Sequence, residues 1–65
     1  MVQYRLEEKT ATETNWHYKN SYKELSEAME EADRRKRKYP KMRCQIFTEI
    51  VIDGEIVFKE IVFWA

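Results

Sequence analysis

The chain has 65 residues, and its 12 basic and 12 acidic side chains cancel to a formal net charge of zero. A neutral chain of this length is expected to form one domain, residues 1–65, with no overall field that would attract nucleic acid or a membrane. One Cys, one His and one Gly exclude an internal disulfide, a four-ligand zinc site and a glycine-rich phosphate loop. We therefore expect no enzyme, no cofactor and no metal site.

The chain begins with the pattern of a β-strand. Val2, Tyr4 and Leu6 alternate with polar residues, as in a strand that buries one face. Residues 9–12 are polar and unpatterned, which is typical of a hairpin connection. Alternation resumes over residues 14–19 and favours a second short strand there.

A helix is expected next. Ser21 and Glu24 have the spacing of a capping box, in which each side chain binds an unpaired backbone N–H of the other residue. The residues that follow at helical spacing form one apolar stripe: Tyr22, Leu25, Ala28, Met29 and Ala32. Acidic residues precede the basic run 34–38, which matches the helix dipole, and Pro40 predicts an end near Lys38.

The last third of the chain predicts a β-hairpin. Asp53-Gly54 lies between two β-prone segments, and this dipeptide favours a type I′ turn. A two-residue turn predicts five pairs: Ile52 with Glu55, Ile50 with Val57, Thr48 with Lys59, Ile46 with Ile61, and Cys44 with Phe63. The core under Leu25 and Met29 is therefore expected to contain Ile46, Ile50, Val57 and Ile61.

The opposite face of this hairpin is unusually apolar. Six of its ten residues are large and apolar, namely Phe47, Val51, Ile56, Phe58, Val62 and Trp64. We expect an α+β fold of the ββαββ type, with one antiparallel sheet of about four strands and a single helix packed on one face. Because one helix covers only one side of a sheet, these six residues are expected to bind a partner. The strand order stays open.

The basic run is a second candidate for binding. Its possible nucleic-acid contacts are Arg34, Arg35, Arg37, Lys38, Lys41 and Arg43. The competing interpretation is a solvated helix end that matches the dipole, because three of these arginines have an acidic residue one turn earlier. On that interpretation, replacing Arg34, Arg35 and Arg37 with Gln should leave folding intact.

Four further residues of catalytic or metal-binding types are expected to have structural or surface roles. Glu49 and Glu60 are expected diagonally on the exposed sheet face, where lone acids serve solubility or register more often than acid–base chemistry. His17 has no second ligand at metal-binding spacing. Cys44 is expected under the helix, where a thiol acts as a small apolar group.

The layout of the chain resembles that of small phage-encoded accessory proteins, including some anti-CRISPR proteins. The likeness depends on Trp16, Ser21, Glu24, residues 26–28 and the Asp53-Gly54 hairpin. These are folding signals, so the resemblance assigns no binding residue. It implies a non-enzymatic protein that binds and occludes a host complex.

The sequence thus favours a protein–protein interaction module that binds through its apolar sheet face. Two alternatives stay open: a small nucleic-acid-binding protein that uses the basic helix end, and a structural homodimer subunit. The expected partner is a second copy or a foreign protein, and not a membrane. The first residues contain no apolar run of signal-peptide length and Cys44 is unpaired, so we expect a cytoplasmic location, which is the host cytoplasm if the chain is phage-encoded.

Overall fold

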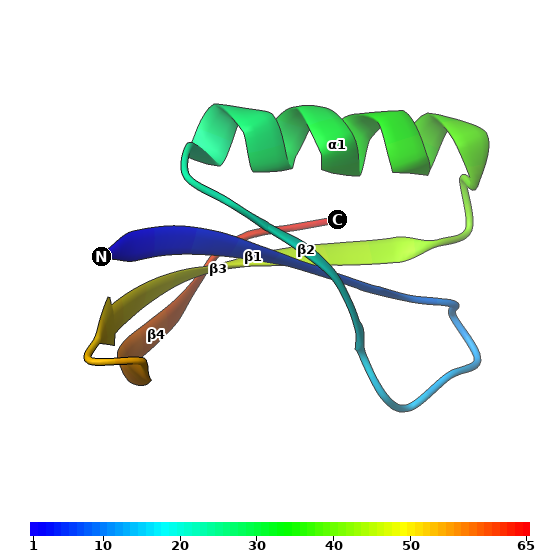
Figure 1. Cartoon of the computed structure of the whole chain (residues 1–65). Coiled ribbons are helices and arrows are strands. Elements are labelled where there is room, and N and C mark those ends of the chain that lie inside the picture. The colour runs from blue at the N-terminus through cyan, green and yellow to red at the C-terminus, as the bar shows by residue number, and fades with distance from the viewer.

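A computed structural model describes all residues, 1–65, and contains four strands and one helix (Figure 1). In chain order these are β1 (Val2–Lys9), β2 (His17–Tyr22), α1 (Leu25–Lys38), β3 (Arg43–Ile52) and β4 (Glu55–Trp64). The strands form one sheet in the order β2-β1-β3-β4, and every neighbouring pair is antiparallel. The predicted α+β fold of the ββαββ type is confirmed, and the strand order is now known.

The strand order explains where the helix lies. Both β2 and β3 run antiparallel to β1, so they run parallel to each other, and α1 connects them by crossing over β1. The helix accordingly packs on β1, β3 and β2 (Figure 1). Strand β4 lies beyond β3, and all its residues except the half-buried Phe63 are exposed.

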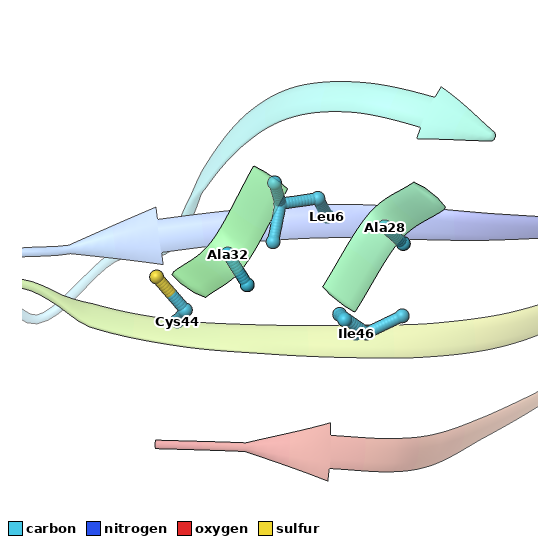
Figure 2. Close-up of a cluster of buried hydrophobic side chains, with 5 residues drawn as sticks. All are labelled: Leu6, Ala28, Ala32, Cys44 and Ile46. Carbon is cyan, nitrogen blue, oxygen red and sulfur yellow. The ribbon is translucent and has the colours of Figure 1, made fainter. Parts of the chain in front are cut away.

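The core is small and lies between the helix and the two central strands (Figure 2). It consists of Leu6, Ala28, Ala32, Cys44 and Ile46. Leu6 and Ile46 are a cross-strand pair of β1 and β3, and the two alanines let the helix approach them closely. The predicted burial of Cys44 is confirmed, and this burial raises the pKa of its thiol. We call the side of the sheet that carries Leu6 and Ile46 the helix face, and the other side the open face.

The predicted core was wrong at four of its positions. Ile50 is only half-buried, and Met29, Val57 and Ile61 are each more than 40% exposed. Ile46 is the only member of the predicted hairpin set that is fully buried. The cause is the position of α1, which covers β1 and the first part of β3 but does not cover β4.

The predicted start of the helix was also wrong, although its end is confirmed. Ser21 lies in β2, where it pairs with Arg5, and α1 begins at Leu25 without a side-chain cap. Strand β2 starts only at His17, because a turn closed by the bond from the Glu13 N–H to the Thr10 carbonyl precedes it. At the other end, α1 stops at Lys38, and the Tyr39 N–H donates to the Arg35 carbonyl at 2.8 Å.

The hairpin turn forms as predicted, but the pairing beyond it shifts twice. Asp53 and Gly54 have φ values of 52° and 79°, as a type I′ turn requires. Pairing then slips at two bulges, so that Ile50 faces Phe58 and Ile46 faces Phe63. Each bulge inserts one extra residue into β4, first Val57 and then Val62.

The two bulges coincide with a repeat in the sequence of β4. The strand reads Glu-Ile-Val-Phe-Lys over residues 55–59 and Glu-Ile-Val-Phe-Trp over residues 60–64. Each five-residue unit faces four residues of β3, and the extra residue is the valine of the unit. In a regular strand a five-residue repeat would alternate between the two faces, but one bulge per unit keeps equivalent residues on the same face.

This register corrects the predicted partner-binding face. Phe47, Val51, Ile56 and Trp64 do share the open face. Phe58 pairs with Ile50 and lies on the helix face, and Val62 is a bulge residue. Ile61, which was predicted for the core, takes the place on the open face opposite Phe47.

Candidate interaction surface

The largest exposed apolar area of the molecule lies on the hairpin of β3 and β4. We call it the hairpin surface and define it by seven side chains that are each 41–67% exposed: Ile52, Ile56, Val57, Phe58, Ile61, Val62 and Trp64. Apart from Ile52, all belong to β4. So many apolar side chains exposed on one hairpin are typical of a region that binds another molecule.

The hairpin surface has two sides. On the helix face, Phe58 lies beside Ile50, and Ile50 pairs in turn with Val2, which is 47% exposed. On the open face, Ile61 and Trp64 stand along β4. Strand β4 is therefore apolar and uncovered on both sides, although an edge strand of a sheet usually presents polar residues to water.

The outer edge of β4 adds free backbone groups to this surface. Val51 exchanges hydrogen bonds with Met1 next to β1, at 2.7 and 2.8 Å, whereas Cys44 exchanges two bonds of 2.9 Å with Ala65 next to β4. Because consecutive residues of β3 bond to opposite neighbours, Glu49 bonds toward β1. Its partner Lys59 therefore directs its backbone N–H and C=O away from β3, to the free edge.

Next to the apolar side chains, the open face contains a buried polar group that the sequence analysis missed. Gln45 Nε2 and Arg5 Nε donate to opposite oxygens of Glu7, both at 2.7 Å. Burial alone would raise the pKa of Glu7, but the hydrogen bonds from Arg5 and Gln45 outweigh it and lower the pKa below its ordinary value. The polar residues that alternate along residues 3–7 and 43–49 were the available signal, but the sequence analysis did not place the two sets next to each other.

Glu49 and Glu60 are not neighbours on one face, which corrects the sequence-based expectation. Glu49 is fully buried on the open face, where Gln3 Nε2 donates to its Oε1 at 3.0 Å and its Oε2 has no partner. Glu60 is exposed and pairs with Thr48 on the helix face. Lys59, opposite Glu49, holds its ammonium 4.2 Å from the centre of the Phe47 ring.

Most side chains of the basic run form hydrogen bonds or ion pairs with other groups of the same chain. Arg35 binds Glu8 of β1 through both carboxylate oxygens, and Lys36 donates to the Met42 carbonyl at 2.7 Å. The other two arginines of the run form ion pairs within α1: Arg34 with Glu31 and Arg37 with Asp33.

The remaining basic candidates are dispersed. Lys38 and Lys41 line an open hollow of about 410 Å³ together with Thr10, Tyr39, Pro40 and Met42. Arg43 begins β3 and pairs with Lys9 on the open face. The six predicted nucleic-acid contacts therefore do not form one continuous patch of free cations.

His17 belongs to a local hydrogen-bonded turn. Its Nε2 lies 2.5 Å from Glu13 Oε2, and the Thr10 N–H donates to the other oxygen of Glu13 at 2.8 Å. The bond from the Thr10 backbone, followed by that from His17, lowers the pKa of Glu13 to about 2. No group of three or more His, Cys, Asp or Glu side chains could hold a metal ion.

Comparison with family models, with curated proteins and with solved structures found no match for this chain. The 14 residues of the one helix are too few, and too polar, to cross a membrane. The hairpin surface is therefore the feature from which a function can be argued.

Proposed function

We propose that this protein is a non-enzymatic protein–protein interaction module that binds its partner through the hairpin surface. The observation that carries the proposal is that β4 is apolar and exposed on both faces and has a free edge. In water, such a strand leaves apolar area exposed that a partner would cover.

The size of the surface supports this proposal. Its seven apolar side chains are each 41–67% exposed, so a partner that covers β4 would remove a large apolar area from water. Two of the seven, Phe58 and Trp64, are aromatic, and buried aromatic residues carry much of the energy of interfaces. The prediction that the partner is a host complex occluded by a phage protein is part of the same proposal and depends on the layout described above.

Nucleic-acid binding through the basic helix end has weaker support. Counterion release requires several cations that are free to meet phosphates. Here Arg34, Arg35 and Arg37 each have an acidic partner within 3.1 Å. Interaction through the hairpin surface is thus the better-supported function.

Site-specific photo-crosslinking tests the proposal. A photoreactive phenylalanine analogue placed at Phe58 or Trp64 should capture a protein in cells that express the chain, and the same analogue at the exposed helix residue Glu27 is the control. We expect discrete adducts from the two hairpin positions and none from Glu27. Equal patterns at all three positions would contradict the proposal.

A further inference from the structure

We propose that the hairpin surface binds a second copy of the chain, and that the two copies join along the free edges of their β4 strands into one antiparallel sheet of eight strands. This inference rests on the proposed function and deepens it by naming the partner and the mode of binding. The composition of β4, the geometry of its edge and its repeat support this inference.

The composition of β4 is that of an interior strand. Seven of its ten residues are apolar: Ile56, Val57, Phe58, Ile61, Val62, Phe63 and Trp64. They lie on both faces of the sheet, as in strands that have a neighbour on each side and a layer above and below. In the single chain, however, β4 is an edge strand. A strand added at its free edge would give β4 the second neighbouring strand that its composition fits.

The backbone of the edge is ready for such pairing. The N–H and C=O of Lys59, near the middle of β4, point away from β3 and have no partner in the chain. An unpaired row of these groups is a template for another strand. A two-fold axis normal to the sheet reverses the strand direction and keeps each face on its own side, so both copies of α1 would lie on the same side.

The five-residue repeat makes this edge complementary to itself. If the axis passes through Glu60, residues 55–59 of one copy run beside residues 61–65 of the other. Phe58 then lies beside Phe63 of the second copy, and both residues belong to the helix face. Lys59 faces Ile61 of the second copy in this register, and the backbone groups of both residues point away from β3, so they can bond to each other.

A second copy also answers the weakness of the single chain. Only five hydrophobic residues are fully buried in 65, and a domain this small gains little stability from its core without help. Self-association is the form of help that needs no disulfide or metal, and the chain has a single cysteine. The one unfavourable contact is the pair of Glu60 carboxylates at the axis, which lie on the exposed helix face.

The test uses sedimentation velocity over a micromolar to millimolar concentration series of the whole chain. We expect a monomer–dimer equilibrium. Lys59→Pro removes one outward N–H but no bond to β3, and it should weaken dimerisation at least about tenfold. Lys59→Ala is the matched control, because it loses the same ammonium but keeps the N–H, and it should stay within about threefold of the wild type. If both substitutions weakened the dimer equally, the two copies would pack through the faces of their sheets, and edge pairing would be overturned.

Glu60→Gln tests the position of the axis with a variant that should not disturb folding, because the side chain is exposed. Removing the two facing carboxylates should tighten the dimer about threefold. A weaker dimer would overturn the assigned register. Circular dichroism and urea unfolding of dilute Lys59→Pro show whether this variant folds, so that loss of the dimer is not confused with loss of the fold.

The outcomes separate this inference from the proposed function. A wild type that stays monomeric at millimolar concentration overturns the dimer. If crosslinks from Phe58 and Trp64 then capture a different protein, the interaction function stands with a foreign partner. If they capture nothing, the proposed function fails as well.

Discussion

A single ion pair attaches the C-terminal half of the helix to the sheet. Arg35 reaches from α1 to Glu8 of β1, where both carboxylate oxygens accept hydrogen bonds, and Lys19 of β2 lies 3.2 Å from the same carboxylate. Glu8 is only 2% exposed, so its charge depends on these partners. Glu31 lies one helical turn before Arg35, a spacing that predicts an ion pair between them, but in the fold Glu31 pairs with Arg34 instead.

Replacing Arg35 should therefore destabilise the fold, contrary to the expectation from the sequence. Arg35→Gln leaves the buried Glu8 carboxylate with Lys19 as its only cation, and we expect a loss of about 2 kcal/mol in the free energy of unfolding. Arg34→Gln is the control, because its side chain is 76% exposed and its loss should cost less than about 0.5 kcal/mol. Urea denaturation at pH 7 measures both, and equal losses would show that the link to β1 contributes nothing.

Two buried carboxylates make stability sensitive to acid. Burial raises the pKa values of Glu7 and Glu8, but hydrogen bonds, from Arg5 and Gln45 to the first and from Arg35 and Lys19 to the second, outweigh burial and lower both. A lowered pKa in the folded state means that the unfolded chain binds protons first as pH falls.

Their contribution to stability is therefore fully present above the unfolded value of 4.5 and is lost as pH falls through the folded values. Urea denaturation at a series of pH values should show a plateau at neutral pH and a decline below about 4.5. Glu8→Gln should be less stable at pH 7 and should lose less on acidification. A variant with the same acid dependence as the wild type would argue against this role of Glu8.

At the scale of the elements, the two strands of the hairpin differ in burial: β3 is partly covered by the helix, whereas β4 is exposed. Ile46 of β3 is fully buried beneath the helix, whereas Ile61 of β4 is 46% exposed. Ile46→Ala should cost about 3 kcal/mol because it leaves a cavity, and Ile61→Ala should cost less than about 1 kcal/mol in the monomer. Dilute samples in a urea titration make this comparison, and similar losses at both sites would indicate that β4 is covered.

Two features that local chemistry determines were predicted correctly from the sequence. The Asp53-Gly54 turn forms because both residues must adopt positive φ, and the helix ends before Pro40 because the proline restricts Tyr39. The capping box failed because Ser21, which has the right spacing from Glu24, is held in the ladder between β1 and β2. Tertiary pairing there outweighed a local preference.

The partner-binding face was predicted only in part, because a period of two cannot describe a bulged strand. The alternation that placed Phe58 on the same face as Phe47 assumed one residue of β4 for each residue of β3. Two extra valines break that count, at Val57 and Val62. The repeat of five residues was the signal in the sequence that could have revealed them.

The shape of the whole molecule follows from how the helix is tethered. A helix of 14 residues is about 21 Å long, and its two ends are fixed to β2 and β3, so it must lie across β1. The central strands are therefore shielded on one face and paired on both edges. Strand β4 has one paired edge and little cover, which makes it the natural place for a partner.

Amide hydrogen exchange of the dilute protein should reproduce this asymmetry. The amides of Leu6 and Ile46, in the shielded strands, should exchange most slowly, and that of Lys59 should exchange within the dead time of the measurement because it bonds to nothing in the monomer. Raising the protein concentration should slow exchange at Lys59 if the second copy binds there. Strong protection of Lys59 in the monomer would contradict the edge geometry.

The central position of β1 also governs how fast the molecule can form. Strand β1 pairs on one side with the nearby β2, but its other partner is β3, and the bonds between Met1 and Val51 join residues 50 positions apart. Closing so long a loop costs chain entropy before the core contacts repay it. The apolar face of the β1–β2 hairpin stays exposed to water until the helix and β3, which follow it in the chain, have been synthesised. Despite its short length, the chain should fold on the millisecond timescale of mixed α/β domains, and not in microseconds as small helical bundles do.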